Sequence, residues 1–309
     1  MSDAAIAETT AAAPTAPEGG DAGPARSLAS DAWRAMRKNP LFWVSSALIF
    51  VFLLMAAWPS LFTSTDPTEA ILREARITPG ADAWFGRDGQ GYDIYARCIY
   101  GARASILVGL LTTIGTTLVG GIIGVFAGYA GGWTDTLLSR IGDVFFAIPL
   151  LLGAVLVLVT LPATDNYYLI VLKVVLALVV LGWPSMARLM RSSVIQVKPN
   201  DYVQAARALG ASPWRVVRSH IVPNALAPMI VVATINLGAY ISAEATLSYL
   251  GIGLQPPTVS WGVDISSAVT ALRSAPHVLF FPSLFLSLAV LAFIMLGDVV
   301  RDALDPKNR

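Results

Sequence analysis

Long apolar runs separated by polar segments dominate the chain from residue 41 onward. A helix that crosses a bilayer needs about 20 apolar residues. Six runs meet this requirement: Leu41–Phe62, Ser105–Ala130, Val144–Leu161, Tyr167–Ala187, Pro223–Tyr249 and Val278–Gly297. Only the fourth and fifth runs contain a charged residue, Lys173 and Glu244 respectively. The pattern predicts an all-α polytopic membrane protein with six transmembrane helices.

The composition and charge of the chain agree with this class of protein. Its 309 residues are 55% hydrophobic and only 13% charged, whereas a soluble domain carries about 25% charged residues. The formal net charge of +1 gives no indication of a nucleic-acid partner. The single Cys98 allows no internal disulfide, and the two histidines, His220 and His277, are too far apart in sequence to suggest a metal site.

The distribution of Lys and Arg residues predicts which side of the membrane each loop faces. Six spans place both chain ends on one side, and that side carries 14 Lys and Arg residues against six on the other. Cytoplasmic loops carry the excess of positive charge. We therefore expect a multi-pass protein of the cell membrane with both termini in the cytoplasm.

The polar segments divide the chain into five parts. Residues 1–40 are an expected disordered cytoplasmic tail, because their first half is rich in Ala, Pro, Thr and Gly and lacks the early apolar core of a signal peptide. The first span, 41–62, is followed by an extracytoplasmic loop at 63–104. Residues 105–298 hold the remaining spans, and residues 299–309 are a short cytoplasmic tail.

The cytoplasmic loop at 200–223, between the fourth and fifth spans, is polar and basic but has the pattern of a short helix. Strong helix formers lie between a capping residue, Asp201, and Gly210, a residue of the kind that ends a helix. Ser212-Pro213 begins a second helix, and Pro223 marks the return of the chain to the membrane. Few large apolar residues are present, which favours docking to a protein over a helix that lies on lipid.

Polar residues recur four positions apart along the fifth span, so they share one face of its helix. They are Asn236, Tyr240, Glu244 and Ser248. Polar side chains inside a membrane normally face a bundle interior or a cavity. The face is either a candidate translocation pathway or a set of interhelical hydrogen bonds, and the pattern leaves both interpretations open.

The two charged residues within spans suggest a candidate intramembrane ion pair. Lys173 and Glu244 each lie about six residues, or about 9 Å, from the outer ends of their spans. A pair would relieve two buried charges. The alternative is that Lys173 extends to the membrane surface while Glu244 joins a polar network.

The segment QAARALG at 204–210, followed after a spacer by HIVPN, resembles the EAA loop of ABC importer permeases. Gln204 stands where the family motif has Glu, which keeps the length and hydrogen bonding but removes the charge. Further segments are similar to the C-type permease of dipeptide, oligopeptide and nickel importers: GARASILVGL at 101–110, GYAGGWTD at 128–135, GWPSMARLMR at 182–191, AEATLSYLGIGLQPPTVSWG at 243–262 and GDVVRDALDP at 297–306. The similarity extends over about residues 30–306.

The resemblance implies a type I ABC importer permease fold, in which a five-helix core at 105–298 follows an N-terminal helix. It also implies a coupling helix in the loop 200–223, which docks on a cytoplasmic ATPase. The residues at the matching positions are Asp201, Tyr202, Gln204, Ala205, Ala206, Gly210 and Pro223.

The partners implied by the resemblance are a second, homologous permease subunit in a heterodimer, a pair of cytoplasmic ABC ATPase subunits or domains, and an extracytoplasmic solute-binding protein. Segments 85–103 and 254–262, the latter with Trp261, are the expected docking sites for the binding protein. Membrane lipid surrounds the spans, and Trp261 also suits the membrane interface.

The resemblance further implies a permease rather than an enzyme, with no cofactor of its own; ATP and Mg are used by the ATPase partners. The sequence contains no G-x-x-x-x-G-K-[ST] nucleotide-binding motif. The expected function is uptake of di- or oligopeptides, and the alternative is a permease for nickel or another chelate or small solute. An ion-coupled secondary transporter is disfavoured, because such proteins often contain repeats and none is evident between 41–161 and 167–297.

Overall fold

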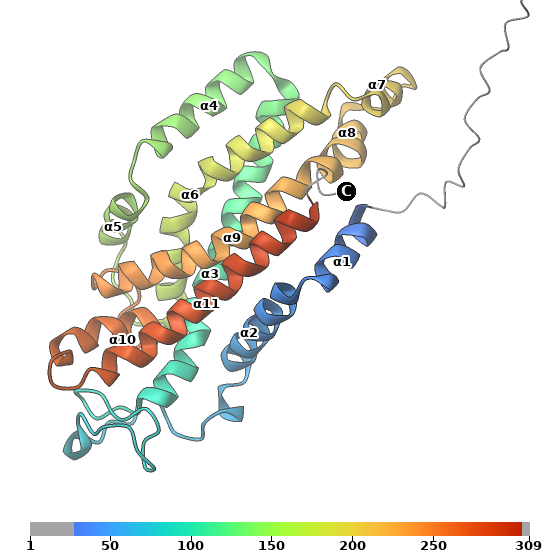
Figure 1. Cartoon of the computed structure of the whole chain (residues 1–309). Helices are drawn as coiled ribbons and strands as arrows, with labels where there is room; N and C mark the ends of the chain where they lie inside the picture. The colour runs from blue at the N-terminus through green and yellow to red at the C-terminus, as the bar shows by residue number, and fades with distance from the viewer. Residues whose placement is uncertain (1–27, 305–309) are drawn as a thin grey trace, which may run out of the picture.

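Long apolar sequences fold into long helices in the computed structural model, which describes residues 28–304 (Figure 1). Within these residues, five helices are long and apolar enough to cross a membrane. They are α2 (Pro40–Ala57), α3 (Ile94–Ala130), α6 (Tyr167–Val197), the continuous helix Pro213–Tyr249 and α11 (His277–Leu304). The described chain contains isolated β-bridges between α2 and α3 but no longer strand, which confirms the all-α class.

The third predicted span, Val144–Leu161, is wrong as a single helix. The chain instead forms α4 (Gly132–Phe146) and α5 (Leu150–Thr160), which meet at a bend of 86°. Pro149 immediately precedes α5, where its missing N–H and its ring prevent the turn of α4 from continuing. The bent pair is a sixth candidate span if the two helices cross the membrane together.

Other predicted segments have different ends because the helices are longer than the apolar runs. The predicted loop 63–104 ends at residue 93, since Asp93 Oδ1 accepts a hydrogen bond from the Ala96 amide at 2.9 Å and starts α3. Short 3₁₀ turns, η1 (Pro59–Leu61) and η2 (Leu72–Glu74), precede it. At the other end of the chain, α11 continues to residue 304, so the first part of the predicted tail 299–309 is helical.

The predicted disordered tail 1–40 contains a helix, α1 (Leu28–Lys38). α1 packs against α11, Ala32 is buried, and the ring of Trp33 meets that of Phe42 edge-on with 5.7 Å between centroids. Contacts with distant segments thus stabilise a helix whose own composition is polar. The remaining parts of the predicted tails, 1–27 and 305–309, lie outside the described residues.

α3 and α6 pack closely because glycines of α3 face the α6 backbone. A Cβ atom on Gly120 would lie 2.6 Å from the Trp183 carbonyl oxygen, and one on Gly124 would lie 2.5 Å from that of Ala187. Small residues allow this approach between membrane helices. α9 (Val222–Tyr249) packs against α3, α6 and α11, α2 lies against α3 and α11, and α4 and α5 lie against α6 (Figure 1).

The bundle has two different ends, which Figure 1 shows at the top and bottom of the view. The α7 end carries α7 (Asp201–Ala208), α8 (Pro213–Val216) and both ends of the described chain. The α10 end carries α10 (Trp261–Ala268), the 3₁₀ turn η4 (Val269–Ala271) and the segment between α2 and α3.

Candidate functional site

The polar loop between α6 and α9 projects from the bundle as the two short helices α7 and α8 (Figure 1). The backbone of Asn200 is extended at the start of α7, but its side chain makes no capping hydrogen bond. Gln204 Nε2 instead donates to the Lys198 carbonyl oxygen at 3.1 Å. The amide at this position therefore ties the first turn of α7 to the end of α6, a bond that a carboxylate cannot donate.

α7 ends at a glycine, as predicted. Gly210 has a φ of +82°, in the left-handed region. The Ala211 amide donates to the Ala206 carbonyl at 3.0 Å, and the Gly210 amide donates to the Arg207 carbonyl at 2.9 Å. These two bonds form a Schellman motif, which fixes the direction in which the chain leaves α7.

α8 begins where the sequence predicts, but the helix that enters the fifth span begins at Pro213, before the predicted start at Pro223. Ser212 Oγ accepts a hydrogen bond from the Arg215 amide at 3.4 Å, and Pro213 takes the first helical position. The helix then continues through a π turn (η3, Val217–Ile221) into α9. The wider π turn accommodates Pro223, whose ring and missing N–H would disturb a regular α-helix.

One face of α7 and α8 is buried against the ends of α6 and α9. Val203, Val216 and Ile221 are fully buried in a cluster with methionines of both long helices. Ala206 also faces inward, whereas its neighbour Ala205 is exposed. The packing of the short helices is therefore continuous with that of the ends of α6 and α9.

Cationic side chains also tie this region to the end of α3. Lys198 Nζ donates to the Tyr129 carbonyl oxygen at 2.8 Å. The guanidinium carbon of Arg207 lies 5.5 Å from the centroid of the Tyr129 ring, a cation–π geometry. α7 is thereby connected to three long helices.

The opposite face of α7 and α8 exposes large apolar side chains. Tyr202, Leu209 and Trp214 are 43%, 89% and 70% exposed. A group of exposed apolar residues on a projecting polar loop is typical of a protein interaction site. The other predicted coupling residues apart from Ala206 are also exposed: Asp201, Gln204, Ala205, Gly210 and Pro223, the last in the first turn of α9.

The predicted polar face of α9 is an interhelical seam in this structure. Tyr240, Glu244 and Ser248 are buried. Asn236 Nδ2 donates to Met186 Sδ of α6 at 3.7 Å, and the Tyr240 hydroxyl lies against Gly182 of α6. Within the single subunit, this face therefore fits the second interpretation, in which its residues hydrogen-bond to and pack against other helices.

The candidate ion pair between Lys173 and Glu244 is not formed, since the ion pairs of residues 28–304 include neither side chain. Lys173 Nζ donates to the Pro162 carbonyl oxygen, beyond the start of α6. Glu244 Oε1 accepts hydrogen bonds from Ser248 at 2.7 Å and Ser260 at 3.4 Å. The lysine stem is long enough to reach past the helix end, which removes the need for the pair.

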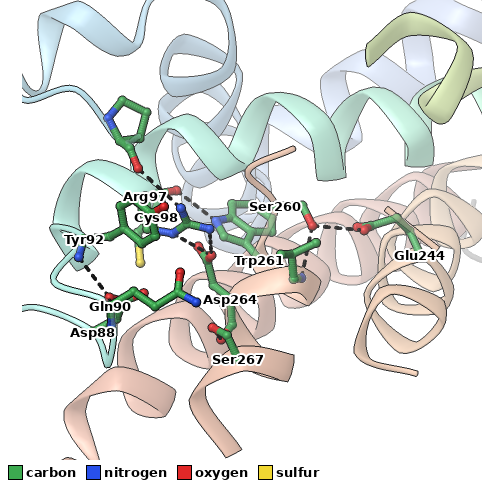
Figure 2. Close-up of polar contacts among 12 residues, drawn as sticks. Asp88, Gln90, Tyr92, Arg97, Cys98, Glu244, Ser260, Trp261, Asp264 and Ser267 are labelled. Atoms are coloured by element: carbon green, nitrogen blue, oxygen red, sulfur yellow. Dashed lines mark hydrogen bonds and ion pairs between the residues drawn. The ribbon is translucent and has the colours of Figure 1, made fainter. Parts of the chain in front are cut away.

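A polar cluster that sequence reasoning missed joins α10 to α3 and α9 (Figure 2). Arg97 of α3 forms an ion pair with Asp264 of α10, with Nε donating to Oδ1 at 2.7 Å. Trp261 Nε1 donates to the Cys98 carbonyl oxygen at 2.9 Å, and Ser260 donates to Glu244 of α9. The signal in the sequence is Ser260, whose Oγ caps α10 by accepting a bond from the Val263 amide.

The buried position of Trp261 corrects the expectation for this one residue of the segment 254–262. Its side chain is 0% exposed, so it contacts neither the membrane interface nor a binding protein. Its ring meets Phe52 of α2 edge-on, with 5.6 Å between centroids. Residue 261 therefore holds α10 against α2 and α3. Within residues 28–304, no group of three or more His, Cys, Asp and Glu side chains is arranged to hold a metal ion.

Two family models match the chain. Residues 27–79 match the N-terminal TM domain of oligopeptide transport permease C, and residues 120–309 match the binding-protein-dependent transport system inner membrane component. The chain belongs to the family of binding-protein-dependent transport system inner membrane components. It is a multi-pass membrane component, which agrees with its long apolar helices.

Several relatives of known function are similar over nearly their whole length. The oligopeptide transport system permease protein OppC of Bacillus subtilis is 39% identical over 283 residues, covering 92% of this chain and 91% of that protein. The dipeptide transport system permease protein DppC of the same organism is 38% identical, covering 93% and 88%. The glutathione transport system permease protein GsiD of Pectobacterium atrosepticum is 34% identical, covering 89% and 90%.

Solved structures show the same fold at lower sequence identity. A chain of the MetNI methionine ABC transporter in an inward-facing conformation has a TM-score of 0.54 and 21% identity, covering 67% of this permease and 96% of that chain. A chain of an amino acid ABC transporter has a TM-score of 0.51 and 17% identity, covering 65% and 91%. The predicted ABC importer permease fold is confirmed.

Proposed function

We propose that this permease is the membrane subunit of an ATP-driven importer that carries di- or oligopeptides into the cell. Relatives that match almost end to end are named for oligopeptide and dipeptide transport, which supports a peptide substrate. The observation that carries the proposal is the pair α7 and α8, which is buried on one face against α6 and α9 and exposes apolar side chains on the other.

In the proposed mechanism, a cytoplasmic ATPase binds the exposed face formed by Tyr202, Leu209 and Trp214. ATP binding closes the ATPase pair and displaces α7 and α8. The buried contacts of Val203 and Val216 pass that displacement to α6 and α9. This chain supplies the path and the coupling helix; its partners bind ATP and Mg and perform the hydrolysis.

The proposed orientation follows from the proposed contact between the α7 end and the ATPases. The α7 end faces the cytoplasm, where the ATPases are, and the α10 end faces outward, where a solute-binding protein delivers the substrate. A second, homologous permease completes the pathway as a heterodimer. The excess of Lys and Arg on the side of the chain ends supports this assignment.

Replacing Leu209 with Asp tests the proposal, because a side chain that is 89% exposed contributes little to the fold. We expect the variant to reach the membrane with the second permease, to lose the ATPase subunits during purification in detergent, and to lose uptake by roughly tenfold. Leu72→Asp is the matched control: Leu72 is 74% exposed at the α10 end, and its replacement leaves the ATPases bound.

Two results would contradict the proposal. One is a Leu209→Asp variant that keeps both its ATPase subunits and its peptide uptake. The other is solute uptake by the purified chain alone under a proton gradient, which would indicate a secondary transporter.

A further inference from the structure

Lys173 is a cation within a membrane-length helix that has no anionic partner in residues 28–304. It lies six residues after the start of α6, about 9 Å along the helix. Its Nζ donates to the carbonyl oxygen of Pro162, but none of the ion pairs includes it. An ammonium group has three donors, so this bond leaves both charge and hydrogen-bonding capacity available. Ionisable residues in this position commonly mark a functional site.

Lys173 lines a cavity of about 430 Å³ at the α10 end. One wall is the end of α5 with the segment 161–165, and the facing wall is the segment 251–257 that follows α9. Gln255 Nε2 donates to the Gly251 carbonyl at 2.6 Å and holds the second wall in a turn. The volume is within the range of about 300–1,000 Å³ found for small-molecule sites.

The cavity presents both signs of charge and an apolar surface to the same space. Asp165 is exposed on one wall, and it has no ion pair within the described chain. Leu158, Val174 and Ile252 provide apolar lining between the polar groups. The cavity therefore has an unpaired cation, Lys173, an unpaired anion, Asp165, and apolar lining between polar groups. These features are complementary to a zwitterion whose two charges are separated by an apolar part.

We propose that this cavity binds the substrate peptide on its way from the binding protein, with the peptide carboxylate at Lys173 and the peptide ammonium at Asp165. The inference rests on the proposed function, which makes the substrate a peptide and the α10 end the outer one. A free peptide carries both charges at its two ends. An anionic lipid headgroup satisfies Lys173 but leaves Asp165 unpaired, so the cavity favours the peptide.

The experiment uses the complete transporter, with its second permease, ATPases and binding protein, in phosphatidylcholine vesicles. Uptake of a labelled dipeptide is compared with uptake of its C-terminal amide and of its N-acetyl form. We expect Lys173→Gln to reduce uptake of the free dipeptide about tenfold, as for a lost charge-assisted hydrogen bond, and to leave uptake of the amide unchanged. Lys173→Arg retains the preference for the free carboxylate.

Asp165→Asn gives the second arm of the experiment. Asp165 is exposed, so its replacement does not endanger folding. We expect this variant to lose the preference for the free amine over the N-acetyl form and to keep the preference for the free carboxylate. Arg273→Gln is the matched control, because Arg273 is an exposed cation at the same end that does not line the cavity. It keeps both preferences.

The outcomes separate this inference from the proposed function. If the native complex takes up dipeptide and both Lys173→Gln and Asp165→Asn keep the native preferences, the cavity inference is overturned and the proposed function stands. A Lys173→Gln defect that appears only in vesicles with anionic lipid or phosphatidylethanolamine also overturns it, because the ligand is then a lipid headgroup. If the native complex takes up no peptide, the proposed function itself fails.

Discussion

Arg97 and Asp264 are opposite charges removed from water at the contact of α3 with α10. Their side chains are only 12% and 7% exposed. The Arg97 guanidinium also donates to the Pro67 carbonyl at 3.3 Å, and it lies 4.8 Å from the centroid of the Tyr92 ring. A buried pair of this kind is costly to break, because the remaining charge has no partner.

Single replacement of either residue is therefore expected to destabilise the protein more than joint replacement. We expect Arg97→Met or Asp264→Leu alone to lower the free energy of unfolding by about 3–5 kcal/mol, and the double variant to lose much less than the sum. Unfolding in detergent by a denaturant, analysed as a double-mutant cycle, measures the coupling. Arg273→Met, at an exposed cation, changes stability by about 0.5 kcal/mol or less. Strict additivity would show that the pair contributes nothing.

For single residues, the sequence predicted the positions of polar side chains better than it predicted their partners. The spacing of Tyr240, Glu244 and Ser248 correctly placed them on one face of α9. Whether that face meets other helices or a pathway depends on which helices pack against it. The depth of Lys173 followed from counting residues, but its partner depended on the rotation of α6 and on the fold of the segment beyond it.

The turn between α7 and α8 depends on a backbone conformation that only some residues tolerate. A Cβ atom on Gly210 would meet no atom within 4 Å, so space does not require glycine there. The φ angle of +82° is what requires glycine, because a residue with an ordinary side chain in this left-handed region costs about 1–2 kcal/mol.

Replacing Gly210 therefore loosens the turn without filling any space. We expect Gly210→Ala to increase amide hydrogen exchange at residues 210 and 211 and to reduce peptide uptake per ATP hydrolysed, whereas Gly210→Asn has a smaller effect because Asn tolerates this conformation. Gly89→Ala is the control, since Gly89 has ordinary φ and no tight contact. Equal exchange and coupling in all three variants would show that the turn is not under conformational constraint.

Among the elements, the sequence predicted the existence of the long helices and missed their bends and extensions. Apolar length identifies a span, but it does not show whether a proline will interrupt it. Pro184, Pro228 and Pro282 all lie inside continuous helices, whereas Pro149 separates α4 from α5. α1 was missed because its polar sequence is stabilised by α11.

For the whole molecule, the proposed orientation has a direct chemical test. The native Cys98 is fully buried, so we expect it not to react and it need not be removed. We expect a membrane-impermeant maleimide to label Leu72→Cys in right-side-out vesicles and to label Leu209→Cys only after permeabilisation and removal of the ATPase subunits, because both side chains are exposed in the chain itself but at opposite ends. The unmodified chain is the control. Reversed labelling would place the α10 end in the cytoplasm.

The helix from residue 213 to residue 249 has 37 residues and is about 55 Å long. It begins in the proposed ATPase contact, and near its far end Glu244 is bonded to Ser260, just before α10. If this helix rotates as a rigid body about a point near its middle, its two ends move in opposite directions. Opening at one side of the membrane is then mechanically linked to closing at the other. A permease open to both sides of the membrane would require this helix to bend. The five-residue π turn is a point at which its regular α-helical geometry is interrupted.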